Sequence, residues 1–332
     1  MSPRRFRLGR RLLLTAAALI GVWALDQLAG RLVNPYIYRI LVLSGINVIL
    51  ALSLNLVNGI TGQFSIGHAG FMAVGGYASA AFTVYAGPRL FGIDAADGGA
   101  PVMALFLASI GIGGLVSAAA GFLVGLPSMR LRGDYLAIVT LGFGEIIRVA
   151  ILNIEAVGGA RGFAGVPRLT TLAWVLAGAL ATFVVIRNLL SSYHGRACLA
   201  IREDEIAAEA LGVPTTRYKV SAFVIAAFFA GVAGALFAHY TYLHTNSFTF
   251  MKSIEVIVMV VLGGMGSLTG SVLGATLLTA LPEALRFASA ERLIIYSLLL
   301  IVLMIARPQG IFGRRELTWR RKKERPEPAA SA

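Results

Sequence analysis

The sequence predicts an all-α, polytopic membrane protein with about eight to ten transmembrane helices, including glycine-broken segments. Of its 332 residues, 57% are hydrophobic and only 14% are charged, whereas soluble domains usually carry about 25% charged residues. The mean hydropathy is +0.79, and the apolar runs are each close to the roughly 20 residues that cross a bilayer. A β-barrel is disfavoured, because barrel strands alternate over about 10 residues instead of forming continuous apolar runs.

Nine apolar segments are candidate spans, and most of the linkers between them are short. In chain order they are residues 12–29, 36–57, 64–86, 101–126, 134–153, 170–190, 219–243, 254–281 and 292–307. The first follows a basic stretch, as a signal peptide would, but no A-x-A cleavage site is evident, so we expect an uncleaved helix. We assign residues 1–310 to one transmembrane domain and residues 311–332 to a basic cytosolic tail.

The excess of basic residues predicts how the chain is oriented. The net charge is +13, which in a soluble protein would suggest nucleic acid. Basic loops beside membrane spans explain it better, so we expect no nucleic acid partner. Placing both termini in the cytosol puts 20 of the 29 lysines and arginines on that side. Nine simple crossings would put the basic tail outside, so one segment must double back.

Residues 254–281 are the segment that we expect to double back. At about 1.5 Å per residue they are too long for one untilted crossing, and a cluster of glycines interrupts them. A second glycine-interrupted stretch, residues 62–80, reads GQFSIGHAGFMAVGGYASA. Paired broken helices in the two halves of a chain indicate a transport pathway, because freed backbone groups are tolerated only where they line a cavity or pack against protein.

The predicted pathway residues come from these two stretches, because they combine glycine breaks with polar side chains. They are Gly62, Gln63, Ser65, Gly67, His68, Gly70, Gly263, Gly264 and Gly266. The side chains of Gln63, Ser65 and His68 would offer polar groups to a passing zwitterion. For the glycines after position 70, close helix packing is an equally good interpretation, since small residues let helices approach each other.

Motifs for catalysis or cofactor binding were not found in the sequence. It contains no G-x-x-x-x-G-K-[ST] phosphate loop, and its only cysteine, Cys198, allows neither an intrachain disulfide nor a cysteine-based metal cluster. We expect no cofactor in this chain and favour a transporter or channel over a membrane enzyme. Among the few ionisable residues within spans are Asp26, Glu145 and Arg148. Glu145 and Arg148 are spaced to form an intramembrane charge pair, either functional or structural.

The polar segment 191–218 is predicted to contain a short amphipathic helix on the cytosolic side. Ile206, Ala207, Ala210 and Leu211 fall on one helical face, while Glu205 and Glu209 share another. Because membrane-surface helices favour basic polar faces, this acidic helix is better suited to docking on a partner protein. A solvated connector is the alternative. The predicted coupling residues are Glu205, Ile206, Ala207, Ala208, Glu209, Ala210, Leu211 and Gly212.

Four further stretches are distinctive, and they read GQFSIGHAGFMAVGGY, GDYLAIVTLGFGEIIR, GGARGFAGVP and VVLGGMGSLTGSVLGA. These stretches resemble the LivM-type permease of branched-chain amino acid ABC importers. Together with EDEIAAEALG they cover roughly residues 45 to 310. The cytosolic helix also resembles the E-A-A coupling motif of such permeases when aligned on Gly212. Ala207 and Ala208 match, Ile206 stands where the motif has glutamate, and Glu205 lies one position earlier.

The resemblance implies a permease subunit in the inner membrane of a bacterium, surrounded by membrane lipid, with residues 1–310 as the permease domain. ATP would be hydrolysed on partner subunits. The implied partners are a LivH-like second permease, two ATP-binding cassette subunits and a periplasmic substrate-binding protein. The implied substrates are mainly leucine, isoleucine and valine. A permease for urea or short amides and an ATP-independent channel or facilitator remain alternatives.

Overall fold

The structure is a computed structural model that describes residues 33–92, 99–131 and 133–285, with a few single positions nearer the termini. The predicted all-α fold is confirmed, and five helices in the described part are long and apolar enough to cross a membrane. These are Pro35–Ile60, Gly99–Ser128, Asp134–Leu152, Leu172–Ser191 and Thr215–Ala238. Each coincides with a predicted span. The predicted spans 12–29 and 292–307 and the tail 311–332 lie almost entirely outside the described residues.

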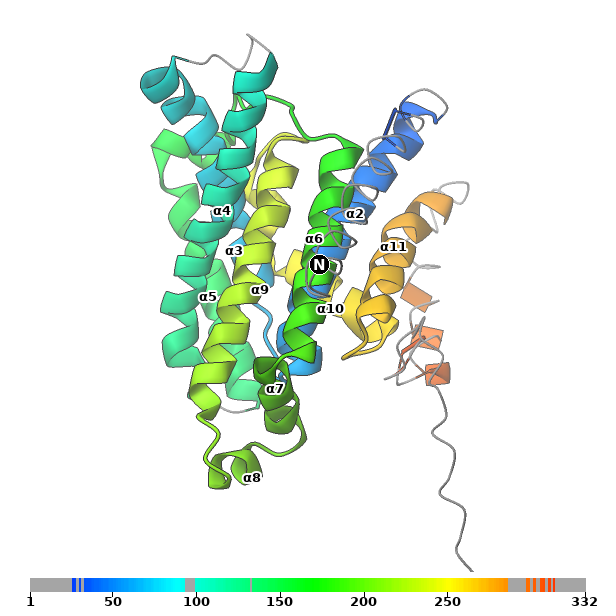
Figure 1. The fold of residues 1–332 in the computed structure, drawn as a ribbon. Coiled ribbons are helices and arrows are strands. Elements are labelled where there is room, and N and C mark those ends of the chain that lie inside the picture. The colour runs from blue at the N-terminus through cyan, green and yellow to red at the C-terminus, as the bar shows by residue number, and fades with distance from the viewer. Residues whose placement is uncertain are drawn as a thin grey trace, which may run out of the picture.

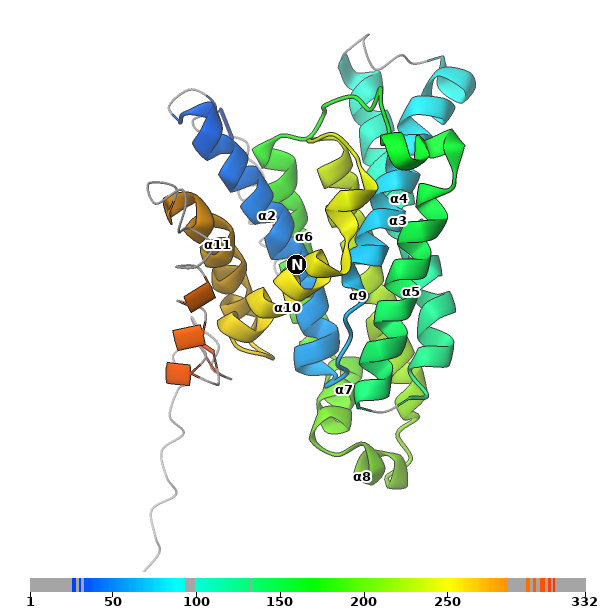
Figure 2. The ribbon, with the colours of Figure 1, turned by 180° about the vertical axis from the view of Figure 1, so that it is seen from behind.

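The long helices form an antiparallel bundle (Figures 1 and 2). They are α2 (Pro35–Asn55), which continues as the π-helical turn η1 (Leu56–Ile60), α4 (Gly99–Ser128), α5 (Asp134–Leu152), α6 (Leu172–Ser191) and α9 (Thr215–Ala238). Helices α2, α4 and α6 run toward the end that carries two short helices, α7 (Tyr193–Glu203) and α8 (Glu205–Ala210). We call this the α8 end of the bundle. Helices α5 and α9 run away from it.

Two shorter helices begin inside the bundle. Residues 62–67 are extended and lead back from the α8 end to α3 (His68–Ala81), which continues as η2 (Phe82–Phe91). In the second half of the chain, a loop that contains η5 (Thr245–Phe248) leads inward to α10 (Phe250–Gly263). Helix α11 (Leu268–Ala284) then runs back from the α8 end.

The predicted break in residues 254–281 is confirmed between α10 and α11. Gly264 has φ +115° and Gly266 has φ +90°, in the region that glycine adopts without steric cost, so the chain reverses there. The first break lies at the start of the predicted stretch 62–80. It occupies the extended residues before His68, and the glycines that follow are inside the regular helix α3.

Close glycine contacts hold α3 against its neighbours. Gly75 of α3 lies against the backbone of Gly231 in α9, where a Cβ atom would overlap it. A Cβ atom on Gly76 would lie 2.9 Å from the carbonyl oxygen of Gly234, and one on Gly113 of α4 would lie 2.6 Å from the carbonyl oxygen of Gly75. The packing interpretation is therefore confirmed for Gly75 and Gly76: α3 is wedged between α4 and α9 with backbones in contact.

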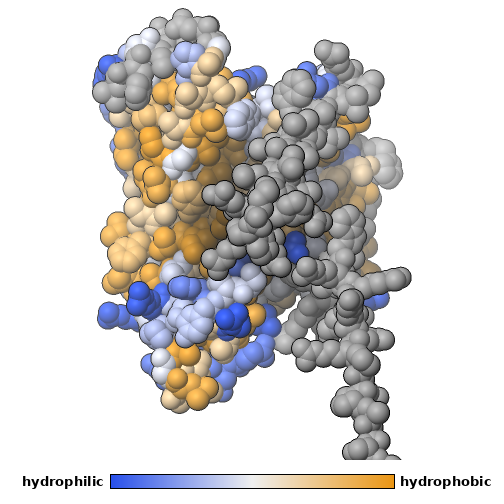
Figure 3. All heavy atoms as spheres, in the orientation of Figure 1, coloured by the Kyte–Doolittle hydropathy of each residue, from blue (hydrophilic) through white to orange (hydrophobic). Residues whose placement is uncertain are grey.

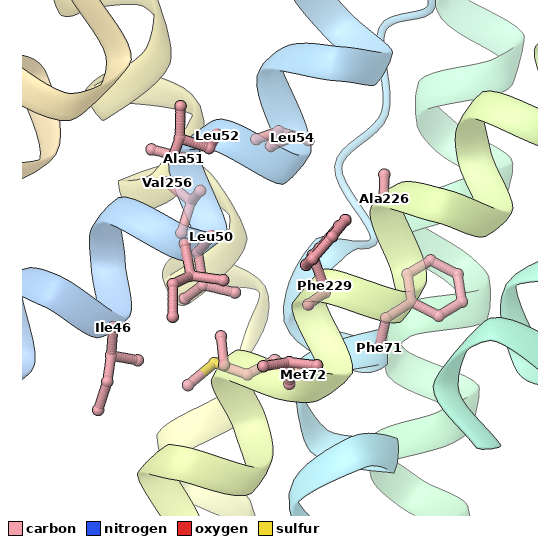
Figure 4. Close-up of a cluster of buried hydrophobic side chains, with 14 of the residues drawn as sticks. Ile46, Leu50, Ala51, Leu52, Leu54, Phe71, Met72, Ala226, Phe229 and Val256 are labelled. Carbon is pink, nitrogen blue, oxygen red and sulfur yellow. The ribbon is translucent and has the colours of Figure 1, made fainter. Parts of the chain in front are cut away.

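The apolar core lies where α2, α3, α9 and α10 meet (Figure 4). Leu50 and Leu54 of α2, Met72 of α3, Phe229 of α9 and Val256 of α10 are all buried there. The core thus joins the two half-helices α3 and α10 to two full-length helices. At the far end of the bundle, the loop after α5 carries η3 (Glu155–Val157) and η4 (Gly159–Arg161) and pairs with the loop after α9 through a single antiparallel bridge.

Candidate functional site

The two half-helices begin beside each other and run toward opposite ends of the bundle (Figures 1 and 2). The backbone N–H of Ala69, in the first turn of α3, donates a hydrogen bond to Ser253 Oγ in the first turn of α10, at 3.0 Å. The first turn of a helix carries N–H groups without intrahelical partners and a partial positive charge. Two such ends therefore meet inside a membrane protein, which is how discontinuous helices are arranged around a substrate path.

The predicted polar pathway residues lie along the extended segment and at the start of α3, and their side chains are buried. His68 Nε2 lies 2.8 Å from Ser53 Oγ of α2. The Ser65 N–H donates to Asn58 Oδ1 at 3.2 Å, and Asn58 Nδ2 donates to the Ser65 carbonyl oxygen at 3.3 Å. Gln63 is 8% exposed. In this conformation these contacts fix the extended segment and the start of α3 against α2.

The predicted pathway glycines pack against backbone from other segments. Gly67 lies against the Thr140 carbonyl of α5, and a Cβ atom on Gly70 would lie 2.9 Å from the Cα of Gly144. Thr140 Oγ1 also accepts a hydrogen bond from the Ile66 N–H at 3.1 Å. Helix α5 therefore covers the extended segment on the side away from α2. Gly263 lies against the backbone of Gly270, so α10 and α11 touch beside the break.

Glu145 and Arg148, which were predicted to pair, form an ion pair on α5. Arg148 Nε lies 2.7 Å from Glu145 Oε2, and the two side chains are 24% and 33% exposed. The third ionisable residue predicted within a span, Asp26, accepts a hydrogen bond from the Tyr38 hydroxyl at 2.8 Å. The partial exposure of the Glu145–Arg148 pair matters because charges facing lipid are costly. Their side of α5 is better suited to water or another protein than to hydrocarbon.

A second ion pair, on α10, was missed by the sequence analysis. Lys252 Nζ lies 3.0 Å from Glu255 Oε2 and donates a hydrogen bond to Asn47 Oδ1 at 3.0 Å. The Asn47 amide in turn donates to Thr279 Oγ1 at 2.9 Å, which links α2, α10 and α11. The i, i+3 spacing is the same as in the α5 pair and could have identified it. The predicted span 254–281 excludes Lys252, because α10 begins four residues earlier, at Phe250.

The predicted cytosolic helix is present as α8, and both of its ends have well-defined caps. Asp204 Oδ1 accepts hydrogen bonds from the N–H groups of Ile206 (2.9 Å) and Ala207 (3.0 Å), as an N-cap does. Gly212, at φ +84°, ends the helix, and the following N–H, of Val213, donates to the Ala208 carbonyl at 3.0 Å. Helix α7, which precedes it, was not predicted from the sequence.

The predicted docking face of α8 points away from the bundle. Ile206 is 67% exposed and Leu211 is 86% exposed, and Ala207 and Ala210 are exposed beside them, whereas Ala208 is buried. Figure 3 shows the same arrangement: hydrophilic side chains surround the lower part of the molecule, and a hydrophobic patch covers the tip below them. An apolar patch beyond a polar surface is typical of a protein contact site.

Comparison with known proteins agrees with this geometry. The family model described as the branched-chain amino acid transport system permease component matches residues 36–307. The LivM proteins of that high-affinity system in Salmonella typhimurium and Escherichia coli are each 39% identical to this chain. The Salmonella match covers 80% of this chain and 67% of the relative, and the E. coli match covers 81% and 68%. The LivH permease of E. coli is 28% identical over 81% of this chain and 92% of its own length. No solved structure gives a significant match. This chain belongs to the family of branched-chain amino acid transport permeases.

Proposed function

We propose that this chain is the LivM-like permease subunit of an ATP-driven importer and forms part of the path for branched-chain or related amino acids. The observation that carries the proposal is the meeting of α3 and α10 at the Ala69–Ser253 hydrogen bond. Two helix N-termini side by side favour a negatively charged group, and every amino acid carries a carboxylate. The substrate class is supported by the names of the relatives, which are branched-chain amino acid permeases.

The extended residues 62–67 are the part of the path that we expect to move. Gln63, Ser65 and His68 are buried here, so they reach a passing substrate only when this segment shifts. The polar contacts that hold this segment and the start of α3 to α2 and η1 include one hydrogen bond between His68 and Ser53 and two between Ser65 and Asn58, each worth only about 1 kcal/mol net. Such contacts suit a permease that releases what it receives.

We propose that α8 docks on an ATP-binding subunit and couples ATP hydrolysis there to transport in this chain. The support is the exposed apolar face around Ile206 and Leu211 at the tip of the molecule and the absence of a phosphate-binding loop from the sequence. Helix α8 is also anchored to the bundle: Lys219 Nζ of α9 lies 2.6 Å from Glu205 Oε2. Glu205, which lies one position before the place where the coupling motif has its glutamate, therefore has Lys219 as a structural partner.

Two substitutions on α8 test the docking face. Ala207→Glu and Leu211→Glu each place a carboxylate on the proposed contact, where burial without a partner costs several kcal/mol. We expect both variants to insert normally, to lose the ATPase on co-purification and to lose uptake. Glu209→Gln, on the acidic face of the same helix, is the comparison and should have a milder effect on both. Equal ATPase retention by all variants, with normal uptake, would remove the docking role of α8.

A second, LivH-like permease is proposed to cover the face on which α5 and α10 border the extended segment (Figure 2). The two ion pairs, Glu145–Arg148 and Lys252–Glu255, are partly exposed there on apolar helices, and lipid would disfavour them. Because both LivM and LivH relatives match this chain, the partner is expected to share its architecture. Single cysteines at Ile146 and Met251, in a Cys198→Ala background, should crosslink to the second permease. A cysteine at Leu123 of α4 should not.

The α8 end is proposed to be cytoplasmic, in a bacterial inner membrane, with both termini on that side. The Ile311 N–H donates to the Leu262 carbonyl at 2.8 Å, so residue 311 lies at the α8 end, directly before the basic tail. The periplasmic substrate-binding protein then docks at the opposite end, where the loop after α5 lies. Uptake assays with labelled leucine competed by urea test the substrate. Uptake that persists with an inactivated ATPase would favour a channel.

A further inference from the structure

Arg202, in the last turn of α7, lies where the two broken segments of the chain come together. Its Nη1 donates a hydrogen bond to the carbonyl oxygen of Gly59 in η1, at 2.8 Å. A Cβ atom on Gly266, in the break between α10 and α11, would lie 2.8 Å from the same Nη1. A Cβ atom on Gly62 would lie 2.9 Å from Arg202 Cγ. We call the three glycines, Gly59, Gly62 and Gly266, the Arg202 seat.

The seat depends on glycine for conformation as well as for space. Gly62 has φ +73° and Gly266 has φ +90°, which side-chain-bearing residues rarely adopt. The arginine therefore rests on bare backbone from both halves of the chain. Its guanidinium is always charged and makes a charge-assisted hydrogen bond to the Gly59 carbonyl.

Asn55, which is fully buried at the end of α2, joins the two sides of the seat. Its Oδ1 accepts a hydrogen bond from the Gly266 N–H at 2.8 Å, and its Nδ2 donates to the Ser267 carbonyl oxygen at 3.1 Å. The end of α2, which leads through η1 to the extended segment, and the α10–α11 break are thus held together. Arg202 contacts η1 and the break beside this connection.

Arg202 is also close to α8 along the chain. Only Glu203 and Asp204 separate it from Glu205, and Asp204 is the N-cap of α8. Figure 1 shows α7 between α8 and the ends of the long helices. Arg202 is therefore about one helical turn away from the first residue of α8. A bound partner that displaces α8 would also displace Arg202.

We propose that Arg202 is the positioning residue through which movement of α8 opens or closes the path at the α8 end. When α7 and α8 shift, the Arg202–Gly59 hydrogen bond is broken or re-formed, and the extended segment and the α10–α11 break separate or rejoin. This inference rests on the proposed docking of α8 to an ATPase. A purely structural role, in which Arg202 only satisfies a free carbonyl at the end of η1, would change stability without changing coupling.

The test uses the complete importer in proteoliposomes and measures both ATP hydrolysis and uptake. In Arg202→Ala we expect ATP hydrolysis to stay within about twofold of wild type. Uptake per ATP hydrolysed should fall about tenfold or more, a shift that loss of a hydrogen bond to a charged group allows. Arg202→Lys keeps the charge without the planar fork and should be intermediate. Arg196→Ala, on the same helix and exposed, is the matched control and should keep the wild-type ratio.

A second variant changes a glycine of the Arg202 seat and leaves the arginine in place. Gly266→Ala places a methyl group against the guanidinium and should uncouple uptake from hydrolysis as Arg202→Ala does. The proposal is wrong if Arg202→Lys and at least one of Arg202→Ala and Gly266→Ala keep the wild-type ratio of uptake to ATP hydrolysis. It is also wrong if uptake and ATP hydrolysis fall in parallel. If Arg202→Ala fails to assemble, Arg202→Lys and Gly266→Ala decide. A wild-type chain that binds no ATPase contradicts the proposed function instead, which keeps the two failures distinct.

Discussion

Lys219 and Glu205 form an ion pair of 2.6 Å that ties the first turn of α8 to the start of α9. The lysine side chain is 1% exposed and the glutamate is 22% exposed, so the pair is close to a buried one. Any force applied to α8 therefore acts directly on a helix that crosses the whole bundle.

Glu205→Gln should lower the thermal stability of the purified protein, because it removes a carboxylate from a buried ammonium group. Breaking a fully buried pair costs about 3–5 kcal/mol, and the partial exposure of Glu205 should reduce that loss. Adding Lys219→Met should recover part of it, since no buried charge then remains. Thermal unfolding of the single and double variants gives the coupling energy, with Glu209→Gln as control. Additive effects would show that the two residues do not interact.

Ser253→Ala should destabilise the junction of the two half-helices. The buried Ala69 N–H would lose the acceptor at 3.0 Å, and an unsatisfied buried donor costs about 1–3 kcal/mol. We expect a lower unfolding temperature together with reduced uptake. Ser191→Ala removes an exposed hydroxyl that bonds only within its own turn and should leave both unchanged. Indistinguishable stability of the two variants would mean that the Ala69 contact contributes little.

Gly234→Ala should be poorly tolerated, because the added methyl group would overlap the Met72 carbonyl of α3. Overpacking of this kind costs about 1–3 kcal/mol or more. Gly111→Ala, on α4, meets nothing within 4 Å and should be neutral or slightly stabilising, because alanine is the better helix former. Yield and melting temperature of the two variants in detergent make the comparison. Equal behaviour would argue against backbone contact between α3 and α9.

Cys198 should react slowly with maleimides in the native protein. Its side chain is 3% exposed, and burial raises the pKa of the thiol, an effect that a hydrogen bond with Thr61 partly offsets. A raised pKa lowers the thiolate fraction near neutral pH, so labelling should accelerate only as the pH rises beyond the usual range for cysteine. Tyr193→Cys in a Cys198→Ala background is an exposed control on the same helix and should label quickly. Comparable labelling rates would mean that α7 does not bury Cys198 as described.

A reporter fused after Ala332 should be silent if it is active only in the periplasm. The expectation follows from the basic residues of the tail and from the position of residue 311 at the α8 end. Reporters placed after Gly162, in the loop that follows α5, should be active. The opposite pattern would reverse the orientation of the whole bundle.

Much of the fold could be predicted because membrane spans are local features of a sequence. The length and apolarity of a span do not depend on the rest of the chain, so α2, α4, α5, α6 and α9 were found within a few residues. The reversal at Gly264 was predicted from chain length, glycine content and the charge of the tail. The first break was predicted within residues 62–80, but its end at His68 was not located, because glycines continue into the helix that follows.

The contacts at the site could not be predicted, because they join residues far apart in the chain. Arg202 bonds to a carbonyl 143 positions away, and nothing in the polar segment around it distinguishes it from a solvated arginine. His68 is costly in hydrocarbon and was therefore predicted to serve the path. In this structure it bonds to Ser53, and its role in transport stays a prediction.

The close fit of α3 against α9 also constrains how the protein is made. Helix α3 and its continuation η2 begin inside the bundle, and the glycine face of α3 matches glycines of α9 that the ribosome adds much later. The native contacts of α3 therefore cannot form before α9 has been synthesised, and its bond to Ser253 must wait for α10 as well. The N-terminal half of the bundle thus reaches its final packing only after most of the chain has been made.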